Sequence, residues 1–238
     1  MAELEIENLC LSFGGLTVLD SVSLKVEAAE LLALIGPNGA GKTSVLNCVS
    51  GIYRGRGHIR FRGLDVAGLS SRAIARLGIA RTFQHSELFR HMSVLDNIMV
   101  GRHARIGTNP FAEALFLGSV RRAEVRHREA VEHIIEFVEL EGVRYAEAGA
   151  LPFGTQKLVG LARALALEPS LLLLDEPSAG LSRDERDDLA RFILRIKHDL
   201  KLPMIWIEHD MQMVATSPTA FTCSTTAVRW HRGPQIRS

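Results

Sequence analysis

The 238 residues carry 28 basic and 27 acidic side chains, and the resulting net charge of +1 excludes a global field that attracts nucleic acid. Three widely spaced cysteines argue against a disulfide framework and against a zinc site, and they fit a reducing compartment. The N-terminus lacks a signal-peptide pattern, and no apolar run approaches the roughly 20 residues that span a bilayer, so any role at a membrane is expected to be peripheral.

The first elements are predicted from the pattern of apolar residues. Residues 3–11 and 20–27 alternate between apolar and polar side chains, which predicts two half-exposed, antiparallel strands. Residues 31–35 are uniformly apolar and predict a buried strand, which a helix at 42–50 follows. Further elements are expected as strands at 58–62 and 79–82, and as a helix at 70–77 that is capped by Ser70 or Ser71.

The remaining elements alternate between helices and strands. The signal from 93 to 142 is helical, because apolar residues between 131 and 138 recur at helical spacing. Helices are then expected at 156–167 and 183–200, and buried strands at 171–174 and 203–207. This order predicts an α/β fold with a mostly parallel sheet covered on both sides, an N-terminal antiparallel β part and an inserted helical subdomain at about 85–155.

Residues 36–43, Gly-Pro-Asn-Gly-Ala-Gly-Lys-Thr, form a complete phosphate-binding P-loop between a predicted strand and a predicted helix. The backbone N–H groups of such a loop converge on phosphate oxygens, and the helix N-terminus adds a partial positive charge. Lys42 is predicted to reach the β- and γ-phosphates, and the Thr43 hydroxyl is predicted to bind Mg²⁺. The predicted phosphate-binding residues are Gly36, Pro37, Asn38, Gly39, Ala40, Gly41, Lys42, Thr43 and Ser44. The fold is therefore expected to be a P-loop NTPase core that binds a nucleoside triphosphate.

Candidate hydrolytic groups follow two of the later strands. Asp175 and Glu176 end the apolar run at 171–174, and catalytic groups of parallel sheets gather at the carboxyl ends of strands. Asp175 is predicted to hold Mg²⁺, and Glu176 is predicted to act as the general base that polarises the attacking water. His209 follows the neighbouring strand and is predicted to contact the γ-phosphate.

These motifs, in this order, resemble the nucleotide-binding subunit of an ABC transporter over residues 4–214. The Q-loop is Arg81-Thr82-Phe83-Gln84, the D-loop is the segment 177–181, and the signature is Leu-Pro-Phe-Gly-Thr-Gln at 151–156, ahead of a helix that begins at Lys157. The resemblance implies that Phe13 stacks on adenine, that Gln84 lies at the catalytic site and its Mg²⁺, and that Gly154 approaches phosphate.

The signature departs from the common Leu-Ser-Gly-Gly-Gln pattern, because Pro152 and Phe153 replace a serine and a glycine. A Leu-Pro-aromatic-Gly signature resembles the ATPases of importers for branched-chain amino acids, as do the Phe-Gly-Gly-Leu at 13–16 and the long insert after Arg102. The backbone donors remain, and the helix N-terminus assists them. Catalysis is therefore expected to persist.

The resemblance also implies partners and a location. Two such subunits, identical or different, are expected to dimerise head to tail around ATP and to drive integral membrane permeases between conformational states. A periplasmic substrate-binding protein is expected as an indirect partner, and nucleic acid is not expected as a partner. The expected location is peripheral, at the cytoplasmic face of the inner membrane. The alternatives are an ATPase without a permease that acts in translation or DNA repair, an importer of urea or short amides, a lipopolysaccharide exporter, and a C-terminally truncated nucleotide binder without a transport function.

The resemblance stops after Val214, so we expect an ATPase domain at 1–214 and an aberrant, poorly ordered tail at 215–238. The tail is rich in Thr, Ser and Arg and shows no clear period. One set of synonymous codons that encodes the tail also encodes, in another reading frame, the segment DLADRIHVLDYGRTLAPGTPDPF. This segment resembles the usual C-terminal end of the family. We therefore expect a one-base deletion, or an error in the sequence, near the codon of Ala215.

Overall fold

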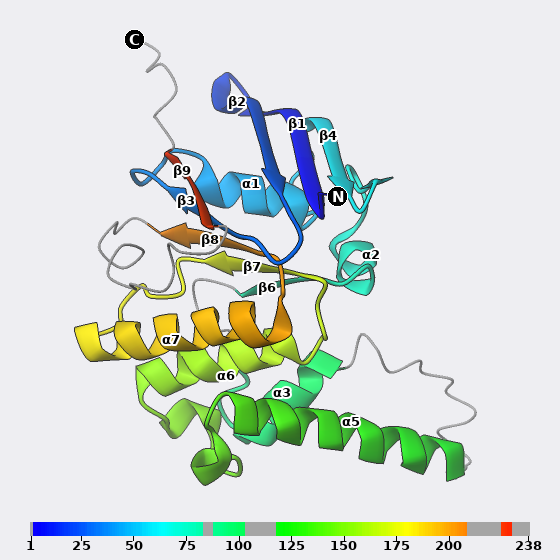
Figure 1. The fold of residues 1–238 in the computed structure, drawn as a ribbon, viewed down its shortest axis with the longest axis vertical. Coiled ribbons are helices and arrows are strands. Elements are labelled where there is room, and N and C mark those ends of the chain that lie inside the picture. The colour runs from blue at the N-terminus through cyan, green and yellow to red at the C-terminus, as the bar shows by residue number, and fades with distance from the viewer. Residues whose placement is uncertain (1, 83–87, 103–117, 209–224, 230–238) are drawn as a thin grey trace. The chain divides into compact units, whose positions relative to one another are not determined.

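A computed structural model describes residues 2–82, 88–102, 118–208 and 225–229 of the chain. The chain forms two compact units (Figure 1). The first unit consists of residues 1–84 and 170–238, and the second consists of residues 85–169.

The first unit contains a four-stranded antiparallel sheet in the order β2-β1-β4-β5. Its strands are β1 (Leu4–Phe13), β2 (Leu16–Val26), β4 (Arg56–Phe61) and β5 (Leu64–Asp65). The predicted antiparallel pairing of the first two strands is confirmed, with Leu4 opposite Val26 and Phe13 opposite Leu16. The second strand begins four residues earlier than residue 20, because Gly14, with a φ of 56°, allows an immediate turn back along β1.

The first unit also contains a five-stranded parallel sheet in the order β6-β7-β8-β3-β9. Its strands are β3 (Leu31–Ile35), β6 (Ile79–Thr82), β7 (Leu171–Asp175), β8 (Met204–Glu208) and β9 (Thr225–Arg229). Every residue of β3, β7 and β8 is buried, as expected for parallel strands that are covered on both faces. The predicted α/β fold is confirmed.

Helix α1 (Lys42–Val49) joins the two sheets of the first unit into one core. Its apolar side chains Val45 and Leu46 share a buried cluster with Leu4 of the antiparallel sheet and with Leu34 and Leu173 of the parallel sheet. Figure 1 shows α7 (Arg183–Leu200) on the opposite face of the parallel sheet. Because β3, β7 and β8 run parallel, the segments after their carboxyl ends emerge at one edge of the sheet.

Polar side chains fix the starts of two helices in the first unit. The Ser70 hydroxyl accepts a hydrogen bond of 3.3 Å from the backbone N–H of Ala73 at the start of α2 (Ser71–Arg76), so Ser70 is the cap. Ser182 and Glu185 form a capping box at the start of α7, in which each side chain bonds the other residue's backbone N–H.

The second unit is helical, with α3 (Val94–Arg102), α5 (Gly118–Phe137), α6 (Phe153–Leu165) and short 3₁₀ turns η1 (Glu141–Val143) and η2 (Ala148–Ala150). Helices α3 and α6 approach closely at Gly101, where a Cβ atom would lie 2.2 Å from the carbonyl oxygen of Arg163. Asn97 is fully buried; its amide nitrogen lies 3.0 Å from the Phe89 carbonyl oxygen and 2.9 Å from that of Ser93. Asn97 therefore fixes the segment that leads into α3.

Two further differences from the sequence prediction concern the start of α6 and the tail. Helix α6 begins at Phe153, not at Lys157, because Pro152 occupies the cap position and its carbonyl accepts the N–H of Gln156, so that the first turn closes there. Gly154 consequently lies inside the first turn of the helix. In the tail, which was expected to lack regular structure, residues 225–229 form β9, because the edge of β3 offers unpaired backbone groups to a parallel strand. The remaining tail residues lie outside the described part of the chain.

Candidate phosphate-binding and hydrolytic site

The P-loop connects β3 to α1, as the sequence predicts. Gly39 and Gly41 have φ values of 77° and 89°, in the left-handed region that glycine adopts without steric cost. A Cβ atom at Gly41 would lie 2.9 Å from the carbonyl oxygen of Val18, so the loop also depends on the missing side chain. The exposed residues from Pro37 to Gly39 form its outer part.

Lys42 is the first residue of α1, and its side chain turns back over the loop. Its ammonium donates hydrogen bonds of 2.7 Å to the carbonyl oxygen of Gly36 and 2.9 Å to that of Pro37. Only 4% of the residue is exposed. Burial lowers the pKa of the Lys42 ammonium below its ordinary value, and nearby carboxylates, with Glu176 first among them, act in the opposite direction.

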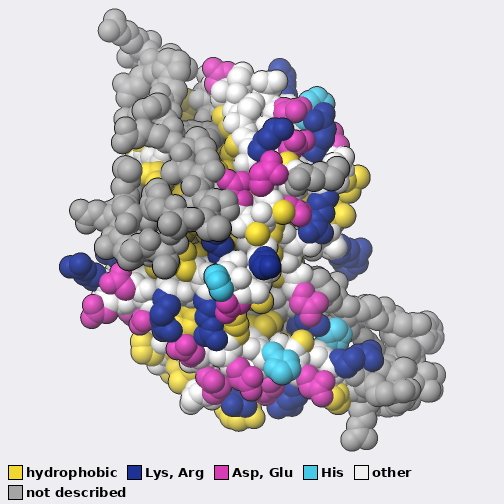
Figure 2. All heavy atoms as spheres, in the orientation of Figure 1, with side chains coloured by type: hydrophobic (Ala, Val, Ile, Leu, Met, Phe, Trp, Pro, Cys, Tyr) yellow, Lys and Arg dark blue, Asp and Glu magenta, His cyan; other side chains and the backbone are white. Residues whose placement is uncertain are grey.

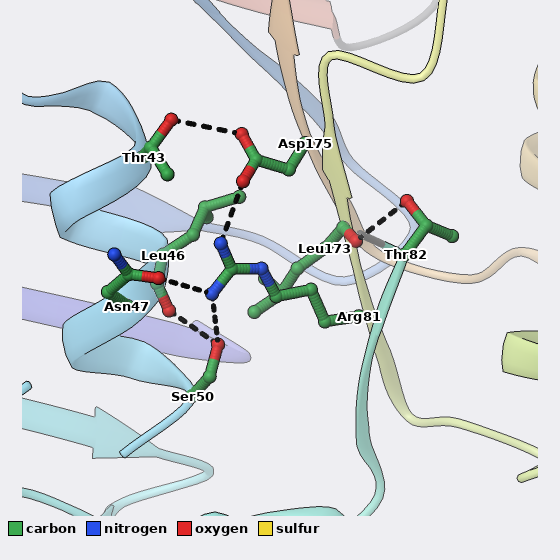
Figure 3. Close-up of polar contacts among 8 residues, drawn as sticks. All are labelled: Thr43, Leu46, Asn47, Ser50, Arg81, Thr82, Leu173 and Asp175. Carbon is green, nitrogen blue, oxygen red and sulfur yellow. Dashed lines mark hydrogen bonds and ion pairs between the residues drawn. The ribbon is translucent and has the colours of Figure 1, made fainter. Parts of the chain in front are cut away.

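Two of the three predicted Mg²⁺ ligands, Thr43 and Asp175, lie together although they are far apart in the sequence. The hydroxyl of Thr43 donates a 3.1 Å hydrogen bond to Oδ1 of Asp175, which ends β7 and is 3% exposed (Figure 3). Mg²⁺ binds through one or two protein oxygens, water and phosphate, and a hydroxyl beside a carboxylate fits that chemistry. Within the described ranges, no group of three or more His, Cys, Asp or Glu side chains is placed to hold a metal ion.

Glu176, the predicted general base, lies directly after β7 and is half-buried. Its φ of 46° is uncommon for a residue with a side chain. Two backbone hydrogen bonds of 3.1 Å fix this conformation, one from its own N–H to the carbonyl of Ile207 and one from the N–H of Ala179 to its carbonyl. These bonds fix the backbone of Glu176 at the carboxyl end of β7.

Two charged residues that hold the site in place, Arg81 and Glu208, receive no such role from the sequence. Arg81 donates a 2.7 Å hydrogen bond from Nη2 to Oδ2 of Asp175. Glu208, at the end of β8, accepts a 2.6 Å hydrogen bond from the hydroxyl of Ser178, two residues after Glu176. Glu208 is 1% exposed and also accepts a 3.2 Å hydrogen bond from the indole of Trp206. The sequence does contain a signal that could have identified Arg81 and Glu208, because each is a charged residue within or directly after an apolar strand. A charge in such a position requires a hydrogen-bonded partner.

The remaining predicted positions are Phe13, Gly154, Gln84 and His209. Phe13 ends β1 with 49% of its surface exposed, and its ring meets Tyr53 edge to face with the centroids 5.1 Å apart. Its ring therefore has exposed surface, as stacking on a base requires. Gly154 belongs to the second unit. Gln84 and His209 lie outside the described residues.

The surface of the described residues mixes charges of both signs. Figure 2 shows basic and acidic side chains interspersed on the visible face. Several form ion pairs, such as Lys25 with Glu5 at 2.8 Å and Arg60 with Glu7 at 2.9 Å. In the ranges that the structure describes, no helix has the length and the apolar character needed to cross a membrane.

Comparisons with known proteins agree with this geometry. The family model described as "ABC transporter" matches residues 19–179. The branched-chain amino acid transport ATP-binding protein BraF of Pseudomonas aeruginosa is 40% identical over 212 residues, which cover 89% of this chain and 83% of BraF. The corresponding LivG protein of Escherichia coli is 37% identical over the same shares of both chains. A crystal structure of an ATP-binding cassette of an ABC transporter, in its ADP conformation, is 29% identical with a TM-score of 0.78, over 91% of this chain and 84% of the other.

Proposed function

The chain belongs to the ABC transporter family as an ATPase subunit, and from this premise we propose that it powers the import of branched-chain or other amino acids. The observation that supports this substrate class is the similarity of the chain to BraF and LivG over 83% of the length of those proteins. The Leu-Pro-Phe-Gly signature at 151–154 supports the same subfamily. Import of urea or a short amide is the second candidate, because an ATPase subunit does not itself contact the transported substrate.

We propose that the site hydrolyses ATP with Mg²⁺ through residues of the first unit. The P-loop N–H groups and Lys42 bind the phosphates, and Thr43 and Asp175 hold the metal. When bound, Mg²⁺ supplies positive charge to the β- and γ-phosphate oxygens. Glu176 accepts a proton from the attacking water, and His209 contacts the γ-phosphate. The hydrogen bond between Ser178 and Glu208 supports this assignment, since it holds the backbone just after Glu176.

We further propose that two copies, or this chain and a related one, enclose ATP head to tail. In that arrangement the P-loop of one subunit faces the Gly154 segment of the other. The position of Gly154 in the first turn of α6 supports this, because the positive end of the helix dipole attracts anions. Gln84 would connect the nucleotide to the second unit and to a permease, and tighter binding of ATP to the closed dimer would supply the driving force.

Expression of the chain with the permease genes from its own chromosomal neighbourhood should carry it to the membrane fraction. The physical reason is that contacts with the permease would hold the chain at the membrane, since no helix in the described ranges can cross it. In proteoliposomes that contain the transporter, the cognate binding protein should stimulate ATP hydrolysis when leucine is present. The same binding protein should not stimulate hydrolysis when urea replaces leucine. The matched control is expression without the permease genes. Recovery of the chain only in the soluble fraction, with the permease present, would contradict the transporter role.

For residues 215–238 we propose a change of reading frame near the codon of Ala215. The support is the alternative-frame segment that contains LDYG and GTP, both typical of the family ending. Resequencing the gene should reveal bases after Val214 that encode this segment once a single base is restored. A nucleotide sequence that cannot encode it in the alternative frame would rule the proposal out.

A further inference from the structure

Arg81 is a charged residue in β6, an edge strand of the parallel sheet, yet its side chain is buried. It lies opposite Leu173 of β7, and only 8% of its side chain is exposed. A buried charge is costly unless hydrogen-bonded partners compensate for the water that it loses. Its place in the fold therefore depends on the groups around it.

Those groups belong to two different elements (Figure 3). Nη1 of Arg81 donates a 2.7 Å hydrogen bond to the side-chain oxygen of Asn47 on α1 and a 3.2 Å hydrogen bond to the hydroxyl of Ser50, which caps that helix. Nη2 donates the 2.7 Å hydrogen bond to Oδ2 of Asp175. The guanidinium is thus held at one end by α1 and holds β7 at the other.

The two oxygens of Asp175 have different partners as a result. Oδ2 is bound to Arg81, and Oδ1 is bound to the hydroxyl of Thr43. A carboxylate can rotate about the bond to its Cβ atom, and a planar guanidinium anchored on α1 restricts this rotation. The carboxylate plane is therefore held with one oxygen toward the Thr43 hydroxyl.

We propose that Arg81 is a positioning residue, which orients Asp175 so that its Oδ1 atom and the Thr43 hydroxyl together receive Mg²⁺. This inference rests on the proposed role of Asp175 and adds a residue that the Mg²⁺ does not touch. Groups that orient metal ligands in this way contribute to metal affinity, although they do not touch the metal. The competing explanation is purely structural, namely that Arg81 only fastens α1 to the sheet.

The test measures metal binding separately from nucleotide binding and hydrolysis. The full-length chain is saturated with the non-hydrolysable analogue AMP-PNP, and Mn²⁺ binding is followed by electron paramagnetic resonance. In Arg81→Met the Mn²⁺ concentration for half-saturation should rise about tenfold, since loss of an outer-shell partner weakens metal binding by roughly 10- to 100-fold. Affinity for metal-free nucleotide in EDTA should stay within about twofold, because the P-loop contacts are unchanged.

Two further variants make the outcome decisive. Arg81→Lys keeps the charge but loses the planar fork, so it should bind Mn²⁺ more weakly than the wild type and more tightly than Arg81→Met; it also serves if the methionine variant does not fold. Arg60→Met removes an arginine–carboxylate pair elsewhere in the same unit and should leave Mn²⁺ binding unchanged. Wild-type Mn²⁺ affinity in a folded Arg81 variant would overturn the inference. If Asp175→Asn also had wild-type affinity, the proposed role of Asp175 would fail instead.

Discussion

Replacing Glu176 with glutamine should lower the rate of ATP hydrolysis by about 100-fold or more, in line with the loss of a general base. Glutamine has nearly the same size but cannot accept the proton of the attacking water. The two backbone hydrogen bonds that fix residue 176 do not involve the side chain, so the geometry should survive. Phosphate release measured in a single turnover gives the rate.

The same variant should still bind ATP, and it should accumulate as an ATP-bound dimer in gel filtration. The matched control is Glu129→Gln, which makes the same chemical change on an exposed position of α5. That control should hydrolyse ATP at the wild-type rate. Equal rates for wild type and Glu176→Gln would disprove the role assigned to Glu176.

Replacing Lys42 with alanine should weaken ATP binding by about 10- to 100-fold, which corresponds to the ~1.5–3 kcal/mol of a hydrogen bond to a charged group. The ammonium is almost fully buried beside the loop, where water screens its charge poorly. Titration with a fluorescent ATP analogue measures the change.

Lys25→Ala is the matched control, because it removes an ammonium from an exposed ion pair with Glu5 in the antiparallel sheet. It should bind ATP as the wild type does. Thermal melting of both variants separates lost binding from lost structure. Wild-type affinity in a folded Lys42→Ala variant would show that another group neutralises the phosphate charge.

The parts of the fold that sequence reasoning predicted well are those with a strong local pattern. The apolar runs at 31–35 and 171–174 became β3 and β7 at nearly the expected bounds, because only a buried parallel strand accommodates such runs. The start of α6 was misplaced, since Pro152 can either end an extended segment or cap a helix, and local sequence does not decide between these roles. The strand β9 was missed because its pairing depends on the edge of β3, which is distant in the sequence.

The candidate site divides in the same way. Lys42, Thr43 and Asp175 belong to motifs with fixed spacing, so their proximity was predictable. Arg81 binds Asp175, which is 94 residues away, and Glu208 binds Ser178, which is 30 residues away. The order of strands in the sheet brings these pairs together. A sequence alone contains the charge but not its partner.

The backbone carbonyl groups that bind Lys42 affect the free energy of nucleotide binding. Its ammonium donates hydrogen bonds to the carbonyl oxygens of Gly36 and Pro37. An incoming phosphate therefore competes with the loop's own backbone, and the affinity reflects an exchange of partners rather than the capture of a bare charge. The same carbonyls can receive the ammonium again when products leave. Such an exchange lowers the net affinity for the nucleotide and preserves the conformation of the loop between turnovers. Both effects favour release of the product, which an ATPase needs as much as it needs binding of ATP.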